Sequence, residues 1–135
     1  MTTVIVVDAS VLATALADDG GDGDRARERL RGEELCAPEL IVLEVASVLR
    51  RQVQSRALEP RRAGLALRDL DDLPIALAAH RPLLPRVWDL RENLTPHDAS
   101  YVALAEATAS VLVTADGRLA RAPGIRCECD VLTGA

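Results

Sequence analysis

The chain has 135 residues, a length typical of one domain spanning 1–135, with 21 acidic residues against 16 basic ones and a net charge of −5. All the basic residues are arginine, which excludes phosphate-binding loops and Schiff-base sites that depend on lysine. Phenylalanine is absent, and tryptophan and tyrosine occur once each; with the negative charge, this argues against base-stacking aromatic platforms and against broad, non-specific nucleic-acid binding.

Short apolar strands alternate with helices along the chain. In chain order, the sequence predicts a strand at 4–7, a helix at 9–17, a loop at 18–24, a helix at 25–31, a strand at 34–37, a long helix from 38 to about 55, a helix at 60–70, a strand at 74–79, helices at 83–91 and 95–109, a strand at 111–114, a helical turn at 117–122 and an edge strand at 125–131. This alternation predicts an α/β domain with a mostly parallel sheet of about five strands. Ligands of such sheets bind beyond the carboxyl ends of the strands.

No leader or membrane span is evident in the sequence. The first apolar run, Val4 to Val7, is short and has no basic residue before it. No uncharged stretch approaches the roughly 20 apolar residues that a spanning helix needs. Three cysteines give no disulfide framework. We therefore expect a cytoplasmic protein with reduced thiols and no membrane partner.

Two aspartates lie where strands are predicted to end. Asp8 directly follows the first strand, and Asp116 follows the VLVT strand after one intervening residue. Each also has a purely structural interpretation: Asp8 could cap the helix that begins at Ala9, and Asp116-Gly117 could form a turn. The residues alone leave both interpretations open.

Glu44 lies in a predicted helix that is apolar nearly all round. Most of its neighbours three and four residues away are apolar, so we expect the helix and the glutamate to be buried. A buried, ionised glutamate is costly unless a cation or hydrogen-bond donors compensate it. An arginine partner is the structural alternative, and a bound metal ion is the functional one.

Asp98 ends the pattern Thr95-Pro96-His97-Asp98, which is typical of a helix start with Thr95 as N-cap, Pro96 at the first helical position and Asp98 at the third. The helix dipole favours a carboxylate there, so capping and ligand roles are compatible. Tyr101, one turn further on, indicates that Asp98 borders the core. His97 is a candidate base, although a histidine beside a cap is more often simply exposed.

The four acids could converge at one edge of the sheet. Four neighbouring carboxylates do not all stay ionised unless cations compensate them, and all-oxygen ligands suit Mg²⁺ or Mn²⁺. One or two such ions could activate a water and stabilise a leaving oxygen on phosphorus. The pattern therefore indicates metal-dependent phosphodiester hydrolysis. A haloacid-type phosphatase is disfavoured, because Ser10 occupies the position of its second acid and lysine is absent.

Four segments carry a family resemblance: VIVVDAS (Val4–Ser10), PELIVLEVASVLRR (Pro38–Arg51), LTPHDASYVALAEA (Leu94–Ala107) and LVTADGRLAR (Leu112–Arg121). In this order and spacing they resemble the PIN-domain ribonucleases and, more narrowly, the VapC toxins of bacterial toxin–antitoxin pairs. The resemblance implies a three-layer α/β/α domain in which Asp8, Glu44, Asp98 and Asp116 form an acidic metal site. It also implies that the hydroxyls of Ser10 and Thr114 orient a carboxylate or water near the metal.

The resemblance implies partners as well. Such toxins cleave RNA, are usually neutralised by a small VapB-like antitoxin, commonly form homodimers, and contact DNA only through the antitoxin. Two alternatives stay open: a non-catalytic interaction domain with the same fold, and a PIN nuclease outside toxin–antitoxin systems.

Arginine is the remaining candidate residue type for binding the phosphates of RNA. Four of the five net negative charges belong to the candidate site carboxylates, so the rest of the surface is near charge balance. Arg118 and Arg121, just after the last site aspartate, are the preferred candidates. The arginines at 25–31 and Arg50 with Arg51 are further candidates, and solvated or ion-paired arginines are the alternative.

Overall fold

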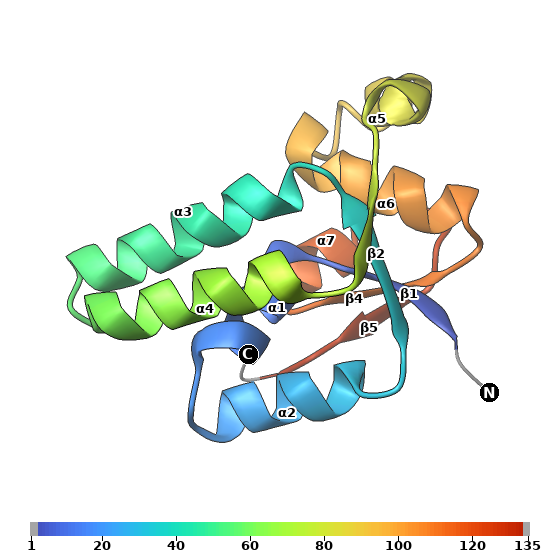
Figure 1. Ribbon diagram of the computed structural model, residues 1–135. Helices are drawn as coiled ribbons and strands as arrows, with labels where there is room; N and C mark the ends of the chain where they lie inside the picture. Colours follow the sequence, from blue (N-terminus) through green and yellow to red (C-terminus); the bar gives the residue numbers. More distant parts are fainter. Residues whose placement is uncertain (1–2, 134–135) are drawn as a thin grey trace.

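The computed structural model describes residues 3–133, which form a five-stranded sheet between two layers of helices (Figure 1). All pairings are parallel, and the strand order is β3-β2-β1-β4-β5. The predicted three-layer α/β/α fold is confirmed. The strands are β1 (Val4–Val7), β2 (Glu34–Pro38), β3 (Ile75–Ala78), β4 (Val111–Thr114) and β5 (Cys129–Val131).

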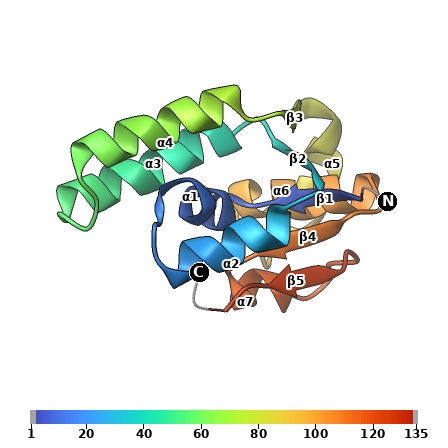
Figure 2. The same cartoon turned by 60° about the horizontal axis from the view of Figure 1, so that its bottom comes forward.

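The helices divide between the two faces of the sheet, as right-handed crossovers require (Figure 2). On one face α6 packs against β1, β2 and β4, and α5 lies against α6. On the other face α1 contacts α2, α3 and α4, and the last two form a pair that lies side by side. The helices are α1 (Ala9–Ala17), α2 (Gly21–Leu30), α3 (Ile41–Gln54), α4 (Pro60–Asp72), α5 (Leu84–Asp89), α6 (Pro96–Ala107) and α7 (Gly117–Ala120), with a 3-10 turn at Arg81–Leu83.

The two central strands place the candidate site. Ile5, Val6 and Val7 of β1 are at most 1% exposed, as expected for a strand buried on both faces. Val7 pairs with Val113 of β4, so both strands end at the same edge. The residues that follow them, Asp8 and Thr114 to Asp116, therefore come together at the carboxyl end of the sheet.

The predicted loop at 18–24 is wrong in its second half. Helix α2 begins at Gly21 and not after Asp24, and its N-cap is Gly20. Packing overrides the turn-forming composition: Gly23 lies so close to α1 that an added Cβ would sit 1.9 Å from the carbonyl oxygen of Asp18. Arg27, one turn later, donates to the same carbonyl at 2.7 Å. The helix start is therefore fixed by contacts that the local sequence does not reveal.

Two further boundaries differ from the prediction by more than two residues. Pro38 ends β2, paired with Ala78, and α3 begins only at Ile41. The last strand covers Cys129–Val131 rather than 125–131, because the preceding segment turns away to bind α6: the N–H of Arg126 donates to Glu106 at 2.7 Å.

No helix within residues 3–133 has both the length and the apolar character needed to cross a membrane.

Candidate functional site

Asp8 lies at the centre of the candidate site and is 7% exposed. Its Oδ1 accepts hydrogen bonds from the Ser10 hydroxyl at 2.7 Å and from the Val11 N–H at 3.1 Å, so it caps α1 as one alternative predicted. Its Oδ2 accepts a bond from the hydroxyl of Thr114, 106 residues away. Burial raises the pKa of Asp8, the three donors oppose that rise, and the charge of Asp116 adds to it.

Thr114 and Asp116 bring the end of β4 to Asp8. Thr114 is fully buried, and its hydroxyl, which donates to Asp8, also accepts from the Asp116 N–H at 2.9 Å. The Ser10 hydroxyl accepts from Ala115 N–H at 3.4 Å, which closes a second link between β1 and β4. Both hydroxyls therefore contact the Asp8 carboxylate, one at each oxygen.

Asp116 is exposed and caps the short helix α7. Its Oδ1 accepts from the N–H groups of Arg118 at 2.9 Å and Leu119 at 3.4 Å. Asp116 is therefore a helix cap rather than part of a plain turn, and within residues 3–133 no hydrogen bond to its Oδ2 is found. An added Cβ at Gly117 would lie 2.8 Å from a guanidinium nitrogen of Arg121, so this side chain folds back over the same turn.

Glu44 reaches the site from α3 and is held by a residue that the sequence did not single out as a ligand partner. The hydroxyl of Tyr101 on α6 donates to Oε1 of Glu44 at 2.5 Å. No arginine within residues 3–133 forms an ion pair with this glutamate. The signal that could have found Tyr101 is its place one turn after Asp98 on an apolar helix, where a buried phenol needs a polar partner.

The predicted burial of the Glu44 helix is wrong in part. Leu43 is 73% exposed and Val42 is 38% exposed, and Glu44 itself is half-buried. Only one side of α3, which carries Ile41, Val45 and Leu49, packs into the core. An apolar face of this helix is therefore open to solvent.

Asp98 takes the predicted position in the first turn of α6. Thr95 caps the helix by accepting from the Asp98 N–H at 3.2 Å, and Pro96 opens the first turn. The Asp98 carboxylate is half-buried above Tyr101, which is 2% exposed.

The charges of three candidate acids converge on Tyr101. Burial, the hydrogen bond to Glu44, and the negative charges of Glu44, Asp8 and Asp98 all raise the pKa of the phenol. The negative charge of Asp116 in turn adds to the rise in the pKa of Asp8. As the side chains stand, however, no three His, Cys, Asp or Glu residues of the described chain are placed to hold one metal ion together. The structure brings all four acids to one sheet edge, but not into a closed coordination sphere.

The arginines at 25–31 are engaged elsewhere. Each has a carboxylate partner: Arg25 pairs with Asp22, Arg27 with Asp24, Arg29 with Asp130 and Arg31 with Glu28. Arg118 and Arg121 are exposed and form no ion pair with another residue of the described segment, 3–133. Arg118 and Arg121 therefore stay the better candidates for binding phosphate.

Comparisons with known proteins show which family and which relatives the chain resembles. Residues 5–125 match the family model described as PIN domain. The chain is 40% identical over 129 residues to ribonuclease VapC9 of Mycobacterium tuberculosis, covering 96% of this chain and 98% of the relative. It is 42% identical over 127 residues to ribonuclease VapC1 of the same species, covering 91% and 93%.

Solved structures share the fold at lower sequence identity. VapC20 of Mycobacterium tuberculosis, described as a toxin that cleaves the sarcin–ricin loop, matches with a TM-score of 0.69 and 15% identity over 90% of this chain and 96% of that one. VapBC2 of Rickettsia felis, solved with a DNA fragment from the promoter, matches with a TM-score of 0.64 and 12% identity over 96% and 98%.

Proposed function

This chain belongs to the PIN-domain family and, within it, to the VapC ribonucleases, and we propose that it is a metal-dependent endoribonuclease that acts as the toxin of a toxin–antitoxin pair. It hydrolyses phosphodiester bonds in RNA and thereby inhibits translation or growth. The observation that carries the proposal is the position of Asp8, buried where β1 ends and hydrogen-bonded to Thr114 where β4 ends.

The residues at this edge fit a hard divalent cation. Every candidate ligand is a carboxylate oxygen, and the charges of three of them add to the effect of burial and of the Glu44 hydrogen bond in raising the pKa of Tyr101. We propose that Asp8, Glu44, Asp98 and Asp116 hold one or two Mg²⁺ or Mn²⁺ ions. When bound, such ions supply Lewis-acid activation of a water and stabilisation of the leaving oxygen.

The other residues of the site hold these acids in place. Ser10 and Thr114 each donate to a different oxygen of Asp8, so its carboxylate has one orientation. Tyr101 does the same for one oxygen of Glu44. Arg118 and Arg121, exposed just beyond Asp116, bind the phosphates of the RNA.

The partners follow from the family. We propose a VapB-like antitoxin, a homodimer in the free state, DNA binding only through the antitoxin, and a place in the cytoplasm. Support comes from the ribonucleases VapC9 and VapC1, which this chain matches over nearly their whole length. The apolar face of α3 that is exposed to solvent, with Leu43 73% exposed, is consistent with a protein partner that binds there.

The test uses purified protein and total bacterial RNA with Mg²⁺ or Mn²⁺, with cleavage sites mapped by primer extension. We expect discrete cleavage that EDTA stops and that Asp8→Asn removes. Asp71→Asn, which changes an exposed aspartate on α4, is the matched control and should cleave normally. Induced expression should slow growth, and co-expression of the cognate VapB-like antitoxin should restore it. Absence of both cleavage and growth arrest would support the non-catalytic alternative.

A further inference from the structure

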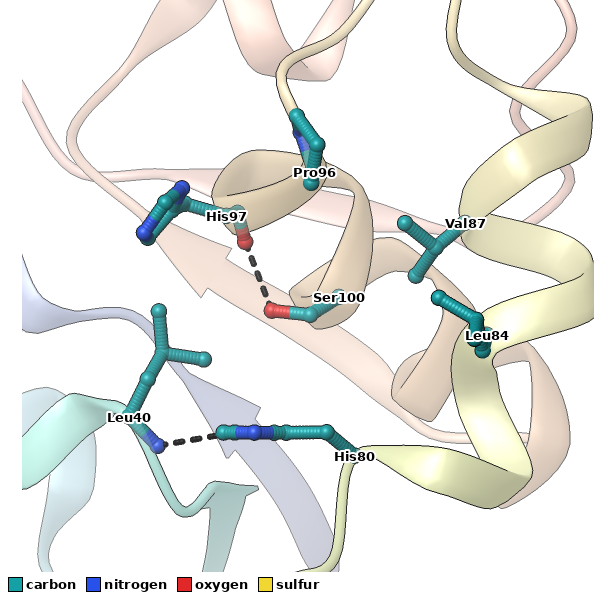
Figure 3. Close-up of a pocket in the computed structure, with 7 residues that line it drawn as sticks. All are labelled: Leu40, His80, Leu84, Val87, Pro96, His97 and Ser100. Atoms are coloured by element: carbon teal, nitrogen blue, oxygen red, sulfur yellow. Dashed lines mark hydrogen bonds between the residues drawn. The ribbon is translucent and has the colours of Figure 1, made fainter.

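Both histidines of the chain line the same cavity (Figure 3). The cavity has a volume of about 200 Å³. Its aliphatic walls include Leu40, Leu84 and Val87, and its polar groups come from His80, His97 and Ser100.

The cavity shares two walls with the acidic site. Leu40 immediately precedes α3 and lies one helical turn before Glu44. His97 immediately precedes Asp98 in the first turn of α6. A group bound in the cavity would therefore contact the residues that lead into Glu44 and Asp98, two of the four acids.

The polar groups of the cavity are held in defined orientations. Nε2 of His80 accepts the Leu40 N–H at 3.0 Å, so the neutral ring carries its proton on Nδ1 and keeps a donor. The Ser100 hydroxyl donates to the carbonyl of His97 at 2.6 Å. The His97 ring is drawn at the end of the cavity near Leu40, away from Leu84 and Val87.

We propose that this cavity takes one unpaired nucleobase of the RNA substrate, next to the cleaved phosphodiester; the inference rests on the proposed ribonuclease function. The volume is below the roughly 300 to 1,000 Å³ of pockets that enclose a whole small molecule, and it suits a single heteroaromatic group. A base has apolar faces for the leucine and valine walls and a polar edge for the imidazole and hydroxyl groups.

An aliphatic side chain of a protein partner is the competing occupant. It would contact the same apolar walls, but it would offer no acceptor to the Nδ1 donor of His80. Arg81 follows His80 directly in the sequence and is exposed, so its charge is available to the phosphate attached to the base. These two features favour a nucleotide over a side chain.

The first test removes the base and leaves the protein unchanged. A synthetic RNA stem-loop carrying the mapped cleavage site is made with an abasic nucleotide at each position flanking the cut, and kcat/KM is measured with wild-type protein. We expect one position to lose about tenfold or more, which is the scale of removing one stacked base. If wild-type protein cleaves no RNA, the proposed function fails; if it cleaves and every abasic position behaves alike, only the base site is overturned.

The second test locates the base in the cavity. Ser100→Leu fills the cavity from α6, and Ser55→Leu, at an exposed position after α3, is the matched control. We expect Ser100→Leu to lose about tenfold with the intact stem-loop and to show no further loss with the sensitive abasic one. Full loss in both combinations would overturn the assignment.

A milder variant covers the case in which Ser100→Leu does not fold. Leu84 is 59% exposed, so Leu84→Ala removes one wall at little cost in stability, and Leu65→Ala on α4 is its control. We expect Leu84→Ala to shrink the abasic penalty. If instead the cavity variants bind the antitoxin more weakly and cleave the intact stem-loop normally, the occupant is a protein side chain and the inference is wrong.

Discussion

The phenol of Tyr101 donates a hydrogen bond of 2.5 Å to Oε1 of Glu44, a residue 57 positions earlier in the chain. The bond joins α6, which covers one face of the sheet, to the first turn of α3. Because burial and three nearby carboxylates raise the pKa of the phenol, it stays protonated and remains a donor. Tyr101 is therefore placed to position Glu44 for a ligand.

Replacing Tyr101 by phenylalanine removes this donor and keeps the buried ring. We expect a loss of about 1 kcal/mol in the free energy of unfolding, measured with urea. We also expect RNA cleavage to need a higher Mg²⁺ concentration, because Glu44 loses its fixed orientation. If unfolding changes and the Mg²⁺ dependence does not, Tyr101 has a structural role only. Glu44→Gln should abolish the difference between the tyrosine and phenylalanine forms.

Divalent cations should stabilise the protein by binding to the four candidate site acids. Asp8 is buried with a raised pKa and feels the charge of Asp116, so the ion-free site carries an electrostatic cost. We expect millimolar Mg²⁺ or Mn²⁺ to raise the melting temperature by mass action. Asp8→Asn should melt at or above the wild-type temperature in EDTA and should not respond to the ions. An unchanged wild-type melting temperature across millimolar Mg²⁺ and Mn²⁺ would count against the metal site.

Much of the site could be predicted because its residues lie next to local signals. Asp8 and Asp116 follow apolar strands, and the Thr95-Pro96 pair indicates the start of the helix that carries Asp98. In a parallel sheet such positions meet at one edge, so strand order alone brings them together. The link between Thr114 and Asp8 is of this kind, since Val7 and Val113 pair in register.

The rest depended on contacts between distant elements. The start of α2 is fixed by the close approach of Gly23 to Asp18, and composition there indicates a loop. The partner of Glu44 is a tyrosine from another helix and not the arginine of the structural alternative. The common cavity of His80 and His97 joins the predicted connection after residue 79 to the start of a predicted helix. Each of these follows from tertiary packing, which periodicity does not encode.

The stability of the protein should depend on the pH through Glu106. Burial alone would raise its pKa, but the Arg86 guanidinium, at 2.7 and 3.1 Å, and the Arg126 N–H lower it overall. Such a group stabilises the fold above its ordinary pKa of 4.5, and this contribution is lost as the pH falls through the lowered value. We expect Glu106→Gln to be about 1 to 3 kcal/mol less stable than wild type at pH 7.

That difference should shrink as the pH falls below 4.5, when the wild-type carboxylate is protonated too. Denaturant unfolding of both proteins at several pH values measures it. Glu28→Gln is the control, because Glu28 and Arg31 form a largely exposed pair, 73% and 76% exposed, that contributes little. A pH-independent difference for Glu106→Gln would show that packing, and not charge, is responsible.

The thiols of Cys127 and Cys129 lie 4.0 Å apart and should be unreactive. Burial, with the neighbouring Cys129 adding to it, raises the pKa of Cys127 to about 12, so little thiolate is present at pH 8. We expect iodoacetamide to modify the folded protein more than about tenfold more slowly than the urea-unfolded protein, as followed by mass spectrometry. Equal alkylation rates at Cys127 in the folded and unfolded states would show that its pKa is not raised in the folded protein.

Arg118 and Arg121 should contribute to RNA binding without contributing to stability. Both are exposed beyond Asp116 and have no ion pair within the described part of the chain, so their charges are available to phosphate. With cleavage blocked by Asp8→Asn, Arg118→Ala should weaken stem-loop binding and reduce the slope of log K against log salt by about one. Arg25→Ala is the control, because Arg25 already pairs with Asp22, and it should change neither quantity. Equal effects of the two substitutions would mean that binding follows net charge and not this position.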